Sequence, residues 1–160
     1  MRSMTEIFLV LHDIRSIHNV GSIFRTADGA GVSKIFLTGY TPTPVDRFGR
    51  KVSAFSKVSL GAEDSVPWEQ RESVADVLQE LKREGTHIVA LEQSSEAVPL
   101  GALLRDARIA LIVGNEVEGV SQEILEVADT VMEIPMRGSK ESLNVSVATG
   151  IALYALTSGD

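Results

Sequence analysis

The segment 19–27 holds the first residues whose types and spacing could do chemistry. Asn19, Ser22 and Arg25 follow at intervals of three residues, and Arg25 lies roughly one and two-thirds helical turns after Asn19, so the three can share the helix start and one flank. An amide there can orient a substrate, and a guanidinium can stabilise developing negative charge. Gly21 lets a ligand or another backbone approach closely. The alternative is an ordinary amphipathic helix with Asn19 as its N-cap and Arg25 in solvent. The apolar face would consist of Val20, Ile23, Phe24 and Ala27.

A second such segment, 112–121, runs from an apolar stretch into an acidic turn flanked by glycines. Gly114 and Gly119 bracket Glu116. In α/β proteins the carboxyl ends of parallel strands are where ligands bind, and glycines there let a ligand contact backbone N–H and C=O groups. The alternative is a plain turn between a strand and a helix.

A third segment, 134–148, gathers small polar side chains at the start of an apolar helix. Ser142 and Asn144 stand there together with Ser139 and Ser146. Residues of this kind favour helix caps, which is the alternative interpretation. Their number exceeds what capping one helix needs, and this favours a binding or catalytic role.

Other reaction centres are excluded by residue type or order. The chain has no cysteine, and His12, His18 and His87 are scattered without the spacing of a metal site. We therefore expect no metal. His18, beside Asn19, could touch a substrate phosphate, but as a lone histidine it more often simply begins a helix. No phosphate-binding P-loop motif exists, and Gly29-Ala30-Gly31 precedes a strand, whereas a dinucleotide fingerprint must follow one.

Apolar runs and periodic stretches in the sequence predict the strands and helices that position these residues. Apolar runs predict strands at 7–11, 34–38, 87–91, 109–113 and 130–134, with a brief extended piece at 66–68. Periodic stretches predict helices over about 19–29, 54–60, 74–84, 121–128 and 143–155. The segment 39–49, with two prolines and two glycines, is predicted to be a loop. Strands alternating with helices predict an α/β fold with a mainly parallel sheet flanked by helices, in a single domain over 1–160.

The charge is unevenly distributed along the chain. The net charge is −7, which argues against a general nucleic-acid binder. Residues 1–58, however, carry eight Lys/Arg against four Asp/Glu, a net +4, and residues 59–160 carry a net −11. Arg47, Arg50 and Lys51 form a basic stretch that could hold RNA, or could simply be a solvated loop. We expect no membrane association and a cytoplasmic location, because no targeting or spanning segment stands out.

In this order, the three segments resemble the SpoU (TrmH-like) family of SPOUT RNA 2′-O-ribose methyltransferases, over about residues 10–156. The resemblance implies S-adenosylmethionine as cofactor, RNA as substrate, a homodimer with the active site at its interface, and a C-terminal trefoil knot. It implies catalytic and structural roles for Arg25, Asn19, Glu116, Ser142 and Asn144. It implies a cofactor pocket lined by Leu91, Gly114, Ile134, Met136 and Leu143. Candidate RNA contacts are Arg15, His18, Arg47, Arg50 and Lys51.

The resemblance implies a general base at the position of Arg25. A guanidinium ordinarily stays protonated. Either a substrate phosphate assists the deprotonation of Arg25, or Arg25 mainly stabilises the negative charge of the alkoxide. The short chain favours tRNA over rRNA as substrate. Because the chain is acidic and shows no RNA-binding extension, an alternative is a cofactor-binding module that needs a partner protein to hold RNA. A nicotinamide- or nucleotide-dependent enzyme lacks its fingerprint here.

Overall fold

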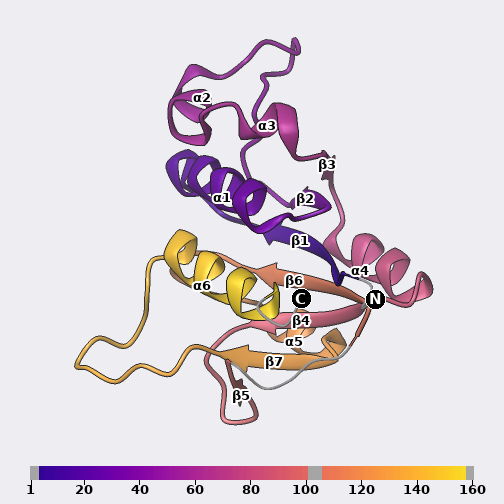
Figure 1. Ribbon diagram of the computed structural model, residues 1–160, viewed down its shortest axis with the longest axis vertical. Coiled ribbons are helices and arrows are strands. Elements are labelled where there is room, and N and C mark those ends of the chain that lie inside the picture. Colours follow the sequence, from indigo (N-terminus) through magenta and orange to yellow (C-terminus); the bar gives the residue numbers. More distant parts are fainter. Residues whose placement is uncertain (1–3, 101–105, 158–160) are drawn as a thin grey trace.

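The computed structural model describes residues 4–100 and 106–157. Within them the chain forms one sheet with helices on both faces (Figure 1). The strands are β1 (Glu6–His12), β2 (Lys34–Thr38), β3 (Trp68–Arg71), β4 (His87–Leu91), β5 (Val98–Pro99), β6 (Arg108–Val113) and β7 (Thr130–Glu133). The helices are α1 (Ile17–Ala30), α2 (Ser53–Ser59), α3 (Ala62–Ser65), α4 (Val74–Arg83), α5 (Gln122–Val127) and α6 (Val145–Thr157).

The sheet is parallel throughout, with the order β3-β2-β1-β6-β4-β7-β5. This confirms the predicted α/β class. β6 lies between β1 and β4, where Val10 is opposite Ile112 on one side and Ala90 is opposite Ile112 on the other. The central strand therefore joins two groups of strands that come from different parts of the sequence.

Alternation along the strands sends side chains into two apolar layers. In β1, Ile7, Leu9 and Leu11 enter the layer beneath α1, α2 and α6, while Phe8 and Val10 face the layer beneath α4 and α5. β1, β2, β4 and β6 are buried on both faces, so they are apolar almost without a break. This explains why short apolar runs in the sequence located these four strands.

Several details differ from the sequence-based expectation. The N-cap of α1 is Ser16, whose hydroxyl oxygen accepts a hydrogen bond from the Asn19 N–H at 3.1 Å. The prediction of Asn19 as the cap was therefore wrong, and its side chain is free for other contacts. The end of α1 at Gly31, in the left-handed conformation with φ 75°, agrees with prediction. The short elements α3 and β5 were missed, and the extended piece expected at 66–68 is instead β3 at Trp68–Arg71, because each is too brief to show a period.

Close packing of α1 on α2 depends on Gly21. A Cβ added there would lie 3.1 Å from the carbonyl oxygen of Phe55 and 3.2 Å from the Cβ of Val58. Phe24 and Phe55 form an edge-to-face pair, with ring centroids 5.1 Å apart. This pair stabilises the same contact between α1 and α2.

We predict that Gly21→Val lowers the free energy of unfolding by about 1–3 kcal/mol, because the branched side chain overpacks a backbone contact. Urea denaturation of the purified variant would measure the loss. Gly138→Val is the control, since a Cβ at Gly138 meets open space. Equal stability of the two variants would show that α1 and α2 do not depend on this close approach.

Candidate active site

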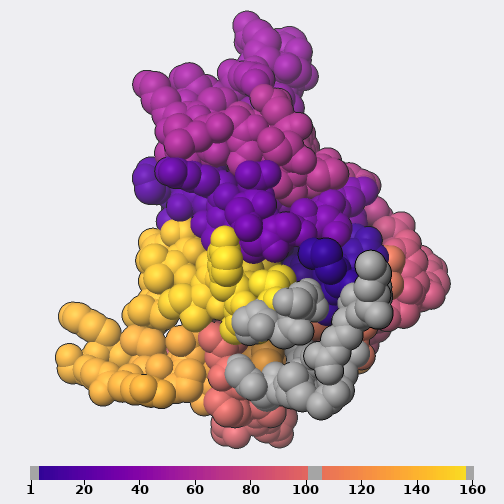
Figure 2. Space-filling model, viewed as in Figure 1, coloured from indigo at the N-terminus to yellow at the C-terminus, as the bar shows by residue number. Residues whose placement is uncertain are grey.

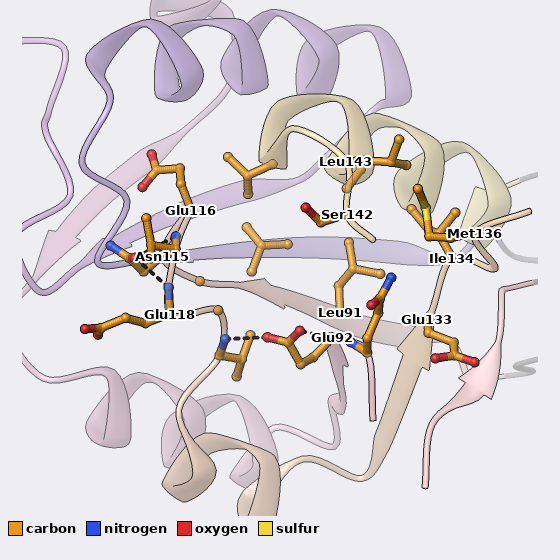
Figure 3. Close-up of a pocket in the computed structure, with 18 residues that line it drawn as sticks. Leu91, Glu92, Asn115, Glu116, Glu118, Glu133, Ile134, Met136, Ser142 and Leu143 are labelled. Atoms are coloured by element: carbon orange, nitrogen blue, oxygen red, sulfur yellow. Dashed lines mark hydrogen bonds between the residues drawn. The ribbon is translucent and has the colours of Figure 1, made fainter. Parts of the chain in front are cut away.

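A cavity of about 360 Å³ opens at the carboxyl ends of β4, β6 and β7, against the start of α6. Figure 3 shows Leu91, at the end of β4, and the adjacent residues Ser142 and Leu143, just before α6, around this space. The structure places all five residues predicted for the cofactor pocket in its lining, together with Glu116 and Ser142 of the predicted catalytic set. Those five are Leu91, Gly114, Ile134, Met136 and Leu143.

The loop after β6 forms one wall of the cavity because two glycines let it fold back on itself. Gly119, with φ 69°, pairs with Asn115, and its N–H donates to the Asn115 carbonyl at 2.9 Å. A Cβ at Gly114 would clash with the Gly119 carbonyl. The Asn115 side-chain oxygen accepts hydrogen bonds from the N–H groups of Val117 and Glu118, each at 2.9 Å. The wall is thus fixed before any ligand binds.

Glu92 connects two of the loops around the cavity. Its carboxylate accepts a hydrogen bond from the Val120 N–H at 2.8 Å, drawn as a dashed line in Figure 3, and its own N–H donates to the Met132 carbonyl at 3.0 Å. The sequence analysis missed Glu92. Its position directly after a parallel strand was a signal that could have found it. Asn115, Gln93 and Glu133 also line the cavity and were missed.

Asn19 holds three distant segments together. Its Nδ2 donates to the carboxylate of Glu116 at 3.3 Å, and its Oδ1 accepts from Nδ2 of Asn144 at 3.2 Å. Asn19 is 8% exposed, while its partners Glu116 and Asn144 lie at the surface, so both bonds are partly buried. The same Glu116 carboxylate accepts the N–H groups of Arg15 and Ser16, each at 3.1 Å. The predicted catalytic residues Asn19, Glu116 and Asn144 therefore form one connected chain.

Glu116 is kept ionised by these contacts. Burial alone would raise its pKa, but the hydrogen bonds from the Ser16 and Arg15 N–H groups, with that of Asn19, outweigh burial and hold the pKa below its ordinary value. Its charge therefore stabilises the start of α1.

Arg25 stands apart from the cavity in this single chain. It is exposed on α1, does not line the cavity, and its side chain has no hydrogen bond or ion pair to the residues that the structure describes. His18 and the Arg15 side chain are exposed near the start of the same helix. Of the basic loop residues, Arg47 is exposed, Arg50 pairs with Asp46 at 2.9 Å, and Lys51 pairs with Asp64 at 2.8 Å.

Within residues 4–100 and 106–157, no cluster of three or more His, Cys, Asp or Glu side chains could hold a metal ion. In the same ranges no helix has the length and apolarity to cross a bilayer. Among the described residues, those that line the cavity include four carboxylates, of Glu92, Glu116, Glu118 and Glu133, and no Lys, Arg or His.

We predict that Glu116→Gln lowers the free energy of unfolding at pH 7 by about 0.5–1 kcal/mol, because a neutral oxygen accepts backbone hydrogen bonds more weakly than a carboxylate and solvent screens part of the difference at this exposed residue. The folded-state pKa is depressed, so this stabilisation is present above the unfolded-state pKa. It is lost as the pH falls through the folded-state pKa. Urea denaturation at pH 7 and in the acid range should show the two proteins converging. Glu118→Gln, without these contacts, serves as control, and a constant difference at all pH values would contradict the prediction.

The sequence and the fold are similar to those of known proteins. The model of the SpoU rRNA Methylase family matches residues 6–154. The tRNA (guanosine(18)-2′-O)-methyltransferase of Aquifex aeolicus is 36% identical over 149 residues, which are 93% of this chain and 67% of that protein. The 23S rRNA (guanosine-2′-O-)-methyltransferase RlmB of Ralstonia nicotianae is 35% identical over 148 residues, 92% of this chain and 57% of that protein.

Among solved structures, the AdoMet-bound rRNA methyltransferase of Sinorhizobium meliloti superposes with a TM-score of 0.87 at 27% identity. The match covers 99% of this chain and 59% of that one. The chain thus spans somewhat more than half the length of several proteins that it resembles. Since the family model covers nearly all of the sequence, the protein belongs to the SpoU rRNA methylase family.

Proposed function

We propose that the protein transfers a methyl group from S-adenosylmethionine to a ribose 2′-hydroxyl of RNA. The observation that carries the proposal is the hydrogen-bonded path from the cavity through Glu116 and Asn19 to α1, the helix that bears Arg25. This path connects a pocket fit for the cofactor to polar groups fit for a ribose. The relatives named as guanosine 2′-O-methyltransferases support the same reaction.

The cavity fits S-adenosylmethionine in size and chemistry. At about 360 Å³ it falls in the range of small-molecule sites. Leu91, Ile134 and Leu143 offer an apolar surface to an adenine ring, and the fixed loop after Gly114 presents backbone groups. Its carboxylates complement the positive sulfonium and ammonium groups of this cofactor.

The bound cofactor would supply a methyl group already activated on a positively charged sulfur. The task of the protein is then to orient the ribose oxygen and to manage its proton. Asn19 positions the start of α1 through Glu116 and Asn144. We assign Arg25 as the group that stabilises the negative charge on the 2′-oxygen while the hydroxyl proton is released to solvent, because a guanidinium remains protonated. Ser142, at the cavity, would hold the ribose through a hydrogen bond.

We further propose that the site is completed in a homodimer. Arg25 lies outside the cavity of its own chain, and this supports a site that is completed by a second copy. On α6, Val147, Ile151 and Tyr154 are 51%, 41% and 53% exposed and recur at the spacing of one helix face. This exposed apolar stripe, beside α1, suits burial against a second copy.

A trefoil knot is part of the same proposal. The segment from Ile134 to Asn144 leaves β7 and contributes Met136 and Ser142 to the cavity beside the loops that follow β4 and β6. Such a path suits a chain threaded through those loops. For the RNA we favour tRNA over rRNA, and we expect the reaction to take place in the cytoplasm.

We predict that Arg25→Ala leaves the affinity for S-adenosylmethionine within about twofold and lowers methyl transfer at least ~100-fold, because an electrostatic contact to the reacting oxygen is lost. Calorimetry would measure the first quantity. Transfer of labelled methyl to tRNA and rRNA from a strain deleted for the gene would measure the second. Arg83→Ala, an exposed arginine on α4, is the control. Full methylation by Arg25→Ala would refute the assignment.

The second candidate, a module that needs a partner protein to hold RNA, is favoured by the charge. The net charge is −7, and two of the three basic loop residues are paired with carboxylates. Electrophoretic mobility shifts at low salt decide between the two. A self-sufficient enzyme retains tRNA by itself, with affinity that falls steeply as salt rises, whereas the partner-dependent module shows no shift until a partner is added.

A further inference from the structure

The chain between β2 and α2 ends in a closed turn, the tip hairpin, formed by residues 45–51. Val45 and Lys51 pair in antiparallel fashion, and the Asp46 N–H donates to the Arg50 carbonyl at 2.8 Å. This part of the chain projects at the top of Figure 1 and forms a knob in the space-filling view of Figure 2. It belongs to the side of the sheet that holds β2 and β3, away from the cavity beside β7.

The Asp46 carboxylate fixes the shape of the tip hairpin. It accepts the N–H groups of Phe48 at 2.8 Å and Arg50 at 3.0 Å, and it binds Nε of Arg50 at 2.9 Å. The hydrogen bond from the Arg50 N–H is the main cause that lowers the pKa of Asp46. Gly49 closes the turn with φ 77°. The side chains at the apex therefore stand on a preformed loop.

The apex presents an aromatic ring with two guanidinium groups close to it. The Phe48 side chain is 66% exposed, so most of its surface remains open to a ligand. The guanidinium carbons of Arg47 and Arg50 lie 4.8 Å and 5.0 Å from the ring centroid. An aromatic face accepts a nucleotide base, and adjacent cations accept its phosphates.

The charges at the apex favour a single nucleotide contact over a broad phosphate-binding surface. Arg50 and Lys51 are paired with Asp46 and Asp64, while Arg47 has no ion pair within the described ranges. One free guanidinium beside one open ring matches an unpaired base and its neighbouring phosphate. A duplex hides its base faces, so it offers nothing for Phe48 to stack on.

We propose that the tip hairpin binds an unpaired nucleotide of the RNA substrate, with Phe48 stacked on the base and Arg47 on the adjacent phosphate. This inference rests on the proposed function, since it assumes an RNA substrate. It narrows that substrate to RNA with a single-stranded loop. It also assigns Phe48 a role in holding the RNA at a position away from the methylated ribose.

The test measures binding of the full chain to two labelled probes by fluorescence anisotropy: a single-stranded oligoadenylate and an RNA duplex of equal charge. Phe48→Ala should weaken binding of the single strand by roughly tenfold, the effect of losing one stacked base, and leave the duplex within about twofold. Phe48→Tyr keeps a stacking ring and should restore binding of the single strand. Leu60→Ala is the matched control, because Leu60 is also an apolar side chain, 64% exposed, but lies outside the tip hairpin.

Arg47→Ala should weaken both probes and reduce the salt dependence of binding by about one phosphate contact. Equal affinity of Phe48→Ala and the unsubstituted protein for the single strand would overturn the inference. Loss of binding in Phe48→Ala that Phe48→Tyr does not restore would also overturn it. Failure of the unsubstituted protein to bind either probe at low salt would count against RNA as its unaided substrate, whereas cofactor binding by calorimetry would be unaffected.

Discussion

The amide of Asn19 is the contact on which the geometry of the site depends. It donates on one side to Glu116, in the loop after β6, and accepts on the other from Asn144, just before α6. An amide is the group that can do both at once, since a carboxylate at this position would face another carboxylate and an aliphatic side chain would leave Glu116 with one partner fewer. Segments separated by about 100 residues are thereby held in one register.

Glu116 connects the Asn19 side chain to the backbone that leads into α1. By accepting the N–H groups of Arg15 and Ser16 it fixes the turn that leads into α1, and therefore the direction in which α1 presents Arg25. The polar residues divide their tasks accordingly. Asn19, Glu116 and Asn144 hold the segments around the site in position, while the apolar side chains of Leu91, Ile134 and Leu143 shape the cavity. A reaction that requires little more than alignment is well served by this division.

Much of this architecture could be predicted from sequence, and the reasons are local. The runs at 34–38 and 87–91 are strands with those bounds, because a strand buried on both faces is apolar throughout and ends abruptly at polar residues. The predicted cavity residues follow strand ends, and parallel strands bring their ends together. The cap of α1 was misplaced because Ser16 and Asn19 both suit an N-cap by residue type. Glu92 was missed because its role comes from contact with Val120, which no local pattern records.

The central place of β6 has a consequence for how the protein is made. β1 has β2 beside it within the first 38 residues, but its other edge pairs only with β6, which begins at Arg108. At a synthesis rate of roughly 5–20 residues per second, that edge waits on the ribosome for several seconds with its backbone groups unpaired. β4 waits for the same strand. The arrival of one apolar hexapeptide in the last third of the chain thus turns two separate nascent fragments into one sheet, and only then can the cavity begin to form.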